Sequence, residues 1–429
     1  MTFPRPLQWL LRTVAAATGL FLLTSLAVLA TWMWRGGIEG GLTAAWRLAQ
    51  HGTTTVDDFR LYPSRTLEPA PSPFPFSDRT RNAAEPPPVE SAPGRSVTVS
   101  QLVSSTETLA LLVVKDDAIV LERYASGHGA STPSQYFSVT KSILATLVGM
   151  AVDDGLIGSI DQPVTDYVPE LAAHGFAAVK LRHLADMTSG IDYAENDNPF
   201  GLHVLMNYTS DLPRMLLDLR MRATPGEKLE YKSGDAALLS LVLQRALGKT
   251  PIADYTGARL WGALGMEHEG IWSLDREGGM EKAWCCLAGT ARDLAKIGRL
   301  HLGHGRVAGK RVLADRWVEE ATRALPPAQA GAWGYAFSLV AAGARGWRIP
   351  GHRQGRAVSL HRPGPQRRHR AAGPRRRRHD DDRLDRRLPK PRPPRLVRRD
   401  ASYSFRMNLP ERPSMIVAFV SSTLPKTFQ

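Results

Sequence analysis

The sequence predicts a mixed α/β protein of the α+β kind, in which an antiparallel sheet is flanked by helices and carries a helical insertion. Two β-rich runs come first, at residues 109–115 and 118–124, and Asp116-Asp117 between them is typical of a hairpin turn. Helical patterns follow, and a strand-like run returns at residues 334–340. A strand hairpin, a helical middle and returning strands are typical of an enzyme domain of this class.

Helical periodicity marks the segments between these strands. Apolar side chains recur at helical spacing over residues 143–151, directly after Ser138, and Gly155 is positioned to end that helix. The same reasoning predicts shorter helices at residues 180–187, 212–221, 236–247 and 290–302.

The positive charge of the chain is concentrated in one segment. The 429 residues carry a formal net charge of +14. Residues 345–399 hold 19 arginines and one lysine against four aspartates, a net charge of +16, so the rest of the chain carries −2. Because the body has no basic excess, we expect no specific nucleic-acid partner for it.

The N-terminal end is typical of a membrane anchor. Residues 1–12 form a short flank, and residues 13–34 carry no charge and are long enough to cross a bilayer as a transmembrane helix. A cleaved signal peptide is the alternative, but bulky Trp32 follows its candidate site, Leu29-Ala30-Thr31. We therefore expect an uncleaved single-pass anchor at the membrane, with the folded domain outside the cytoplasm, in the periplasm.

The rest of the chain divides by composition. Residues 35–95 are rich in proline and predict an extended linker, within which residues 42–51 favour a short amphipathic helix on the membrane surface. The folded domain is expected at residues 96–344. An Arg/Pro-rich segment without apolar period follows at 345–400, and the C-terminal segment 401–429 contains a β-like run at 414–420.

Two interpretations of residues 345–400 stay open. One is a disordered basic tail that binds nucleic acid or anionic lipid. We favour the other, a change of reading frame in a GC-rich gene, because arginine and proline codons are what out-of-frame GC-rich DNA yields. In that case the last strands and the closing helix of the domain would be missing.

The two cysteines, Cys285 and Cys286, are adjacent. Sequence neighbours rarely form a structural disulfide, so we predict that both are packing residues. No group of residues has metal-ligand spacing, and the sequence implies no metal or cofactor.

Ser138 and Lys141 form the one Ser-x-x-Lys pair of the chain, at the start of the predicted helix. Residues three apart share a helix face, so the lysine amine can reach the serine hydroxyl. A hydroxyl needs a base to become a nucleophile, and a lysine in a dry pocket can provide one. The positive end of the helix suits a developing oxyanion.

With these residues the chain resembles the serine β-lactamase and penicillin-binding-protein superfamily, in particular its class C-like branch of esterases, D-amino-peptidases and 6-aminohexanoate-dimer hydrolases. The resemblance extends from about residue 109 to residue 340. It rests on motifs in family order: Phe137-Ser138-Val139-Thr140-Lys141-Ser142, Asp161-Gln162-Pro163-Val164-Thr165-Asp166-Tyr167-Val168-Pro169-Glu170-Leu171, Leu184-Ala185-Asp186-Met187-Thr188-Ser189-Gly190-Ile191, Pro225-Gly226-Glu227-Lys228-Leu229-Glu230-Tyr231-Lys232-Ser233 and Ala288-Gly289-Thr290-Ala291-Arg292-Asp293-Leu294-Ala295.

The resemblance implies a β-lactamase-like fold and a serine hydrolase that cleaves a small-molecule amide or ester through an acyl-enzyme. Ser138 matches the acylated serine, Lys141 its general base, and Tyr231 the tyrosine that passes a proton to the leaving group. Ser233 matches the third position of the Tyr-x-Ser motif, and Tyr193 lies where related enzymes carry a substrate-contacting tyrosine.

The family also has a third motif, of Lys-Thr-Gly or His-x-Gly type, on a strand beside the nucleophile. This chain offers Gly351-His352 at that place, as a degraded form that would help to bind the substrate. Two rival functions follow. One is a β-lactamase or D,D-peptidase of cell-wall metabolism, against which the missing Lys-Thr-Gly argues. The other is an inert membrane-anchored fragment with a basic interaction tail.

Overall fold

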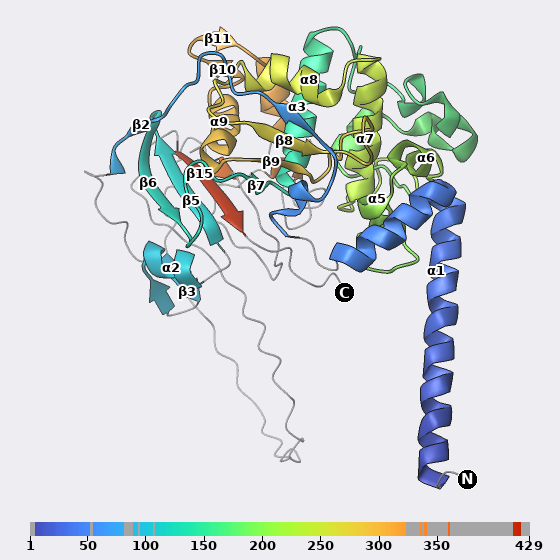
Figure 1. The fold of residues 1–429 in the computed structure, drawn as a ribbon. Coiled ribbons are helices and arrows are strands. Elements are labelled where there is room, and N and C mark those ends of the chain that lie inside the picture. Colours follow the sequence, from blue (N-terminus) through green and yellow to red (C-terminus); the bar gives the residue numbers. More distant parts are fainter. Residues whose placement is uncertain are drawn as a thin grey trace, which may run out of the picture.

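The computed structural model describes residues 5–51, 55–80, 89–92, 95–105 and 108–322, with short strand segments at 335–336, 339–340, 359–360 and 415–421. Expectations for Gly351 and His352, and for most of residues 345–400, lie outside these residues. Figure 1 shows a body of sheets and helices from which the first part of one long N-terminal helix extends as a rod.

The α-helices of the described residues are α1 (Arg5–His51), α2 (Val99–Ser105), α3 (Val139–Asp153), α4 (Leu181–Ala185), α5 (Leu202–Tyr208), α6 (Leu212–Leu217), α7 (Ser233–Leu247), α8 (Ile252–Thr256), α9 (Ala291–Leu302) and α10 (Asp315–Ala321). The strands are β1 (Ser64–Leu67), β2 (Ser77–Asp78), β3 (Val89–Ala92), β4 (Arg95–Val97), β5 (Thr108–Lys115), β6 (Ala118–Tyr124), β7 (Ser134–Gln135), β8 (Gly270–Ser273), β9 (Leu287–Gly289), β10 (Arg306–Val307), β11 (Lys310–Arg311), β12 (Tyr335–Ala336), β13 (Leu339–Val340), β14 (Ser359–Leu360) and β15 (Met415–Ser421).

The larger sheet has the strand order β14-β15-β5-β6-β2. Its neighbouring strands are antiparallel except for β2 and β6, which are parallel. The predicted hairpin is confirmed, since Asp116 and Asp117 both adopt positive φ at its two-residue turn. The β-like run near the C-terminus is β15, which pairs along β5. The mixed α/β fold with an antiparallel sheet is thus confirmed.

Helices cover both faces of this sheet. Leu112 and Val114 of β5 belong to a buried cluster with residues of α9, and Leu111 and Val113 belong to a cluster with residues of α2. Alternate residues of a strand face opposite sides, so a strand covered on both sides needs an apolar run without alternation. This explains the unbroken run of residues 109–114.

A second, four-stranded sheet has the order β1-β8-β9-β7 and is antiparallel throughout. Its edge strand β1 lies within residues 35–95, for which the sequence predicted an extended linker. The structure differs because Pro63 and Pro69 stand outside the strand and leave its N–H groups free for pairing with β8. Leu67, at the end of β1, is fully buried.

The helix α1 bends at Gly37, where φ is 78°. Residues 6–50 are the one stretch of the described chain with the length and composition of a membrane-crossing helix, a test that a signal sequence also passes. Beyond Gly37 the helix runs back against α5 and α6 (Figure 1). The first part of the predicted linker is therefore a helix packed on the body.

Cys285 and Cys286 are joined by a disulfide, which corrects the prediction of two unpaired packing residues. The N–H groups of both residues donate to the carbonyl oxygen of Lys282, at 3.3 Å and 3.0 Å. This tight turn curls the chain so that the two side chains meet. Cys286 is also buried, so it does contribute to packing.

Candidate active site

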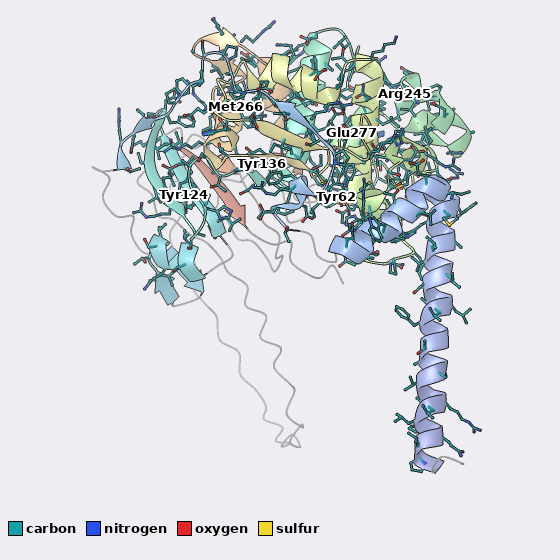
Figure 2. All side chains as sticks on the ribbon, viewed as in Figure 1. Tyr62, Tyr124, Tyr136, Arg245, Met266 and Glu277 are labelled. Atoms are coloured by element: carbon teal, nitrogen blue, oxygen red, sulfur yellow. A yellow bond between two sulfur atoms is a disulfide. The ribbon has the colours of Figure 1, made fainter. Side chains whose placement is uncertain are left out.

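Ser138 lies where β7 gives way to α3. Tyr136, labelled in Figure 2, fixes the approach by donating its hydroxyl to the carbonyl oxygen of Thr290 at 2.8 Å. Phe137 then adopts a φ of 48°, a left-handed conformation that costs of order 1–3 kcal/mol for such a residue. Ser138 is the N-cap of α3, but its side chain makes no capping hydrogen bond. Its hydroxyl therefore remains available for chemistry.

Lys141 is brought to this hydroxyl by the first turn of α3, as the spacing predicted. Its Nζ donates to Ser138 Oγ at 3.1 Å and to the carbonyl oxygen of Trp284 at 2.9 Å. The side chain is only 2% exposed. Both acceptors are neutral oxygens, one of a hydroxyl and one of a backbone carbonyl. The distance allows a proton to move between Ser138 Oγ and Lys141 Nζ.

Tyr231 completes a cluster of three. Its half-buried ring lies with its centroid 5.1 Å from Lys141 Nζ. At that distance the ring packs against the lysine amine. The structure thus brings Ser138, Lys141 and Tyr231 together from two segments that lie 90 residues apart in the sequence.

Ser233 begins α7 and is buried. Its N–H and its hydroxyl donate to the two carboxylate oxygens of Glu195, at 2.6 Å and 2.5 Å. An acidic side chain at a helix N-terminus satisfies unpaired N–H groups and complements the helix dipole. Ser233 is therefore held in place two residues after Tyr231, and its hydroxyl is occupied by Glu195.

Tyr193 is buried behind the cluster, with 2% of its surface exposed. Its hydroxyl lies 2.8 Å from His203 Nδ1, and burial raises its pKa well above 10. Its ring packs so closely on Gly234 that a Cβ there would lie 2.7 Å from Tyr193 Cδ2. Its predicted contact with substrate stays a prediction.

Asn207, on α5, connects the two sides of the site. Its side-chain oxygen accepts a hydrogen bond from Trp284 Nε1 at 3.3 Å, and its Nδ2 lies 3.4 Å from His203 Nε2. Trp284 holds Lys141 through its carbonyl oxygen, while His203 lies against Tyr193 and 3.7 Å from Glu195. The base and the Tyr-x-Ser segment are thus tied to one short helix.

A second buried lysine supports Asn207 from outside the site. Lys282 Nζ donates to the carbonyl oxygen of Asn207 at 2.6 Å and lies 3.6 Å from the ring centroid of Tyr62. Burial, with the nearby charge of Arg47, lowers the pKa of Lys282 well below its usual value. Tyr62, labelled in Figure 2, is also covered by Arg47 of α1, at 5.0 Å.

Asp235 is a buried carboxyl group in the first turn of α7. It accepts a hydrogen bond from Ser189 Oγ at 2.5 Å, whereas its Oδ2 has no hydrogen-bond partner among the described residues. Burial raises its pKa to about 7, against the opposing effects of Lys232 and Ser189. The described residues hold no cluster of three or more His, Cys, Asp or Glu side chains suited to a metal ion.

Sequence reasoning did not identify Glu195, His203, Asn207 or the Trp284 carbonyl. Glu195 lies in the stretch around Tyr193 that the resemblance singled out, but it meets Ser233 across 38 residues, and no spacing rule connects them. Gly351 and His352 lie outside the described residues, and their part in the site stays a prediction.

The fold and the site define a class. A helix that begins with Ser-x-x-Lys beside an antiparallel sheet, with a tyrosine ring over the lysine, is the arrangement of β-lactamase-like serine hydrolases. A family model described as Beta-lactamase matches residues 98–379, and the chain belongs to this family of hydrolases, which act on amides and esters.

Two relatives refine the comparison. The 6-aminohexanoate-dimer hydrolase of Paenarthrobacter ureafaciens is 30% identical over 234 residues, which cover 52% of this chain and 58% of that protein. The chain thus matches little more than half the length of that relative. A solved structure from Bacillus anthracis, provisionally assigned as a 6-aminohexanoate-dimer hydrolase, has a TM-score of 0.62 and 18% identity, covers 87% of this chain and 88% of that chain, and shows the same fold.

Proposed function

We propose that the chain is a serine hydrolase that cleaves a small amide or ester through an acyl-enzyme on Ser138. The observation that carries this proposal is the 3.1 Å hydrogen bond from the buried Lys141 amine to the uncapped Ser138 hydroxyl. A nucleophile and a base within hydrogen-bond reach are the minimum for covalent catalysis.

The reaction would proceed in two halves. Lys141, as the general base, takes the proton of Ser138 as Oγ attacks the carbonyl carbon, and the carbonyl oxygen becomes an oxyanion. Tyr231 gives its proton to the leaving nitrogen or oxygen as that bond breaks, and Lys141 returns a proton to the phenolate. Water then attacks the acyl-enzyme with the same groups in reverse, which releases the acid and restores Ser138.

The amino end of α3 supports the oxyanion. The N–H of Ser138 has no acceptor among the described residues, and the positive end of the helix dipole lies at the same place. Each well-placed donor of this kind contributes roughly 100- to 1,000-fold to kcat in serine hydrolases. The second donor, expected from the strand of the third motif, falls in residues that the structure does not describe.

The name of one relative supports a candidate substrate class. The Paenarthrobacter protein is named for the dimer of 6-aminohexanoate, a linear amide. We therefore take short linear amides, and the corresponding esters, as candidate substrates of this chain.

We also propose that α1 is an uncleaved anchor that holds the catalytic body outside the cytoplasm, in the periplasm. The exposed apolar side chains of its first part, from Leu7 to Leu26, support this proposal.

The test is steady-state hydrolysis by the full chain in detergent or nanodiscs. The panel contains p-nitrophenyl esters, the linear 6-aminohexanoate dimer and a chromogenic cephalosporin. We expect turnover of an ester or the linear amide that is lost in Ser138→Ala and Lys141→Ala and kept in the control Ser159→Ala, a serine in a surface turn. Equal turnover in Ser138→Ala would overturn the proposal, and turnover of the cephalosporin alone would reassign the substrate class.

A further inference from the structure

The second part of α1 exposes three large apolar side chains, while small residues lie between it and the body. Beyond Gly37, the face toward the body carries Gly40 and Ala44, which are buried. Ile38, Leu42 and Trp46 face away from the body and are 67%, 49% and 65% exposed. Residues four apart share one helix face, so these three form a continuous apolar stripe. A surface helix normally has the opposite arrangement.

Close contacts prevent the helix from rotating to bury this stripe. A Cβ on Gly40 would lie 2.8 Å from Thr209 Oγ1, so only glycine lets the two segments approach. Arg47 donates to the carbonyl oxygens of Tyr208 and Thr209 at 3.2 Å and 3.1 Å. These carbonyls end α5, where the helix dipole favours a cation. The orientation of the stripe is therefore fixed by its contacts with α5.

The chain itself indicates what covers the stripe. The stripe begins three residues after Arg35, which ends the uncharged run of residues 13–34. Trp34, at the end of that run, is also highly exposed. Tryptophan collects at the boundary between hydrocarbon and water. Trp34 lies just before the stripe, and Trp46 is its last member. If α1 spans the membrane, the bilayer that holds residues 13–34 lies next to this exposed apolar surface.

We infer that residues 38–51 form an interfacial helix, with Ile38, Leu42 and Trp46 lying in the headgroup region of the bilayer. This inference rests on the proposed role of α1 as an anchor. A helix that lies in the interface buries its apolar face at the boundary of headgroups and acyl chains. Because the opposite face is fixed on α5, the catalytic body is held on the membrane in one orientation and does not swing on a flexible linker.

The same contacts place the membrane surface near the catalytic groups. The helix α5 receives Arg47 at its end and also carries His203 and Asn207, which contact Tyr193 and Trp284. The structure therefore fits a hydrolase whose site is held beside the bilayer.

The test measures depth in the membrane and does not depend on activity. The two native cysteines are bonded to each other, so an introduced cysteine is the only free thiol of the chain. Nitroxide labels are placed by Leu42→Cys and Trp46→Cys in the full chain, reconstituted in phosphatidylcholine vesicles. Lys249→Cys, exposed on the body, is the control in water, and Leu22→Cys reports the span itself. Accessibility to oxygen and to a water-soluble nickel chelate gives the depth of each label.

We expect the labels at positions 42 and 46 to be protected from the chelate at least several-fold more than the label at 249, and less deeply buried than the label at 22. Equal access at 42, 46 and 249 with protection at 22 would overturn the interfacial helix and leave the anchor intact. Access at all four positions would overturn the anchor as well. Protection at 42 and 46 with dipolar broadening of their spectra would overturn the interfacial helix, because a second copy of the chain would then cover the stripe.

Discussion

Glu195 provides the sharpest mutational test of the site, because two variants separate its hydrogen bonds from its charge. Its carboxylate accepts from the N–H and the hydroxyl of Ser233 at 2.6 Å and 2.5 Å, and only 13% of the side chain is exposed. Glu195→Ala leaves both donors without their partner at the start of α7. Glu195→Gln keeps the shape, since its amide can accept from the N–H and donate to the Ser233 oxygen.

The magnitude follows from the two bonds. A hydrogen bond to a charged group contributes about 1.5–3 kcal/mol. In Glu195→Ala, Ser233 and Tyr231 are no longer held in position. If the transition state thereby loses the stabilisation of one such bond, the acylation rate falls roughly 10- to 150-fold. In Glu195→Gln both hydrogen bonds remain, and we expect a loss below about fivefold.

The assay is stopped-flow acylation with a p-nitrophenyl ester, with KM and the melting temperature measured on the same samples. A positioning role lowers the acylation rate and leaves KM nearly unchanged. An acylation rate in Glu195→Ala equal to that of the wild type would contradict a positioning role for Glu195. A loss in Glu195→Gln as large as in Glu195→Ala, at an unchanged melting temperature, would show that charge matters and hydrogen-bond geometry does not.

Three further predictions concern activity, pH dependence and packing. Asn207→Ala removes the acceptor of Trp284 Nε1, a bond of about 1 kcal/mol, and should lower the acylation rate by roughly fivefold with KM unchanged. Asp235 has a pKa of about 7 when folded and an ordinary value of 3.8, so the folded state binds the proton more tightly and stability falls as the pH rises from about 4 to 7. Denaturant titrations should show a decrease of about 4 kcal/mol over that interval which Asp235→Asn abolishes, and a flat wild-type profile would contradict the assignment. Gly149→Ala places a Cβ 2.5 Å from Trp317 Cε2 in the core, so the free energy of unfolding in denaturant titrations should fall by about 1–3 kcal/mol, and an unchanged value would show that the core yields there.

The sequence predicted those elements whose signals are local. The hairpin of β5 and β6 follows from two apolar runs around a turn, and α3 follows from periodicity over one segment. The helix α7 begins at Ser233, three residues before the predicted start, because Glu195 stabilises a first turn of polar residues that has little helical propensity of its own. No local pattern could include a carboxylate 38 residues away.

The short strands and the helix α5 were missed for a related reason. β8 and β9 have four and three residues, and each is defined by pairing with distant segments. α5 has seven residues and is stabilised by the contacts of its neighbours. The site divides in the same way. Ser138 and Lys141 could be predicted from their spacing on one helix, and Tyr231 from family resemblance. Asn207 could not be predicted, because it joins the site only through tertiary contacts with Trp284 and His203.

The proposed chemistry requires that Lys141 activates Ser138 as a nucleophile. The most direct measurement is covalent labelling of the full chain with a fluorophosphonate probe, followed by intact mass and peptide mapping, in wild type, Ser138→Ala and Lys141→Ala. We expect one adduct on Ser138, none in Ser138→Ala, and labelling slowed at least 100-fold in Lys141→Ala. A folded wild-type chain that takes up no probe, or an adduct that persists in Ser138→Ala, would contradict it.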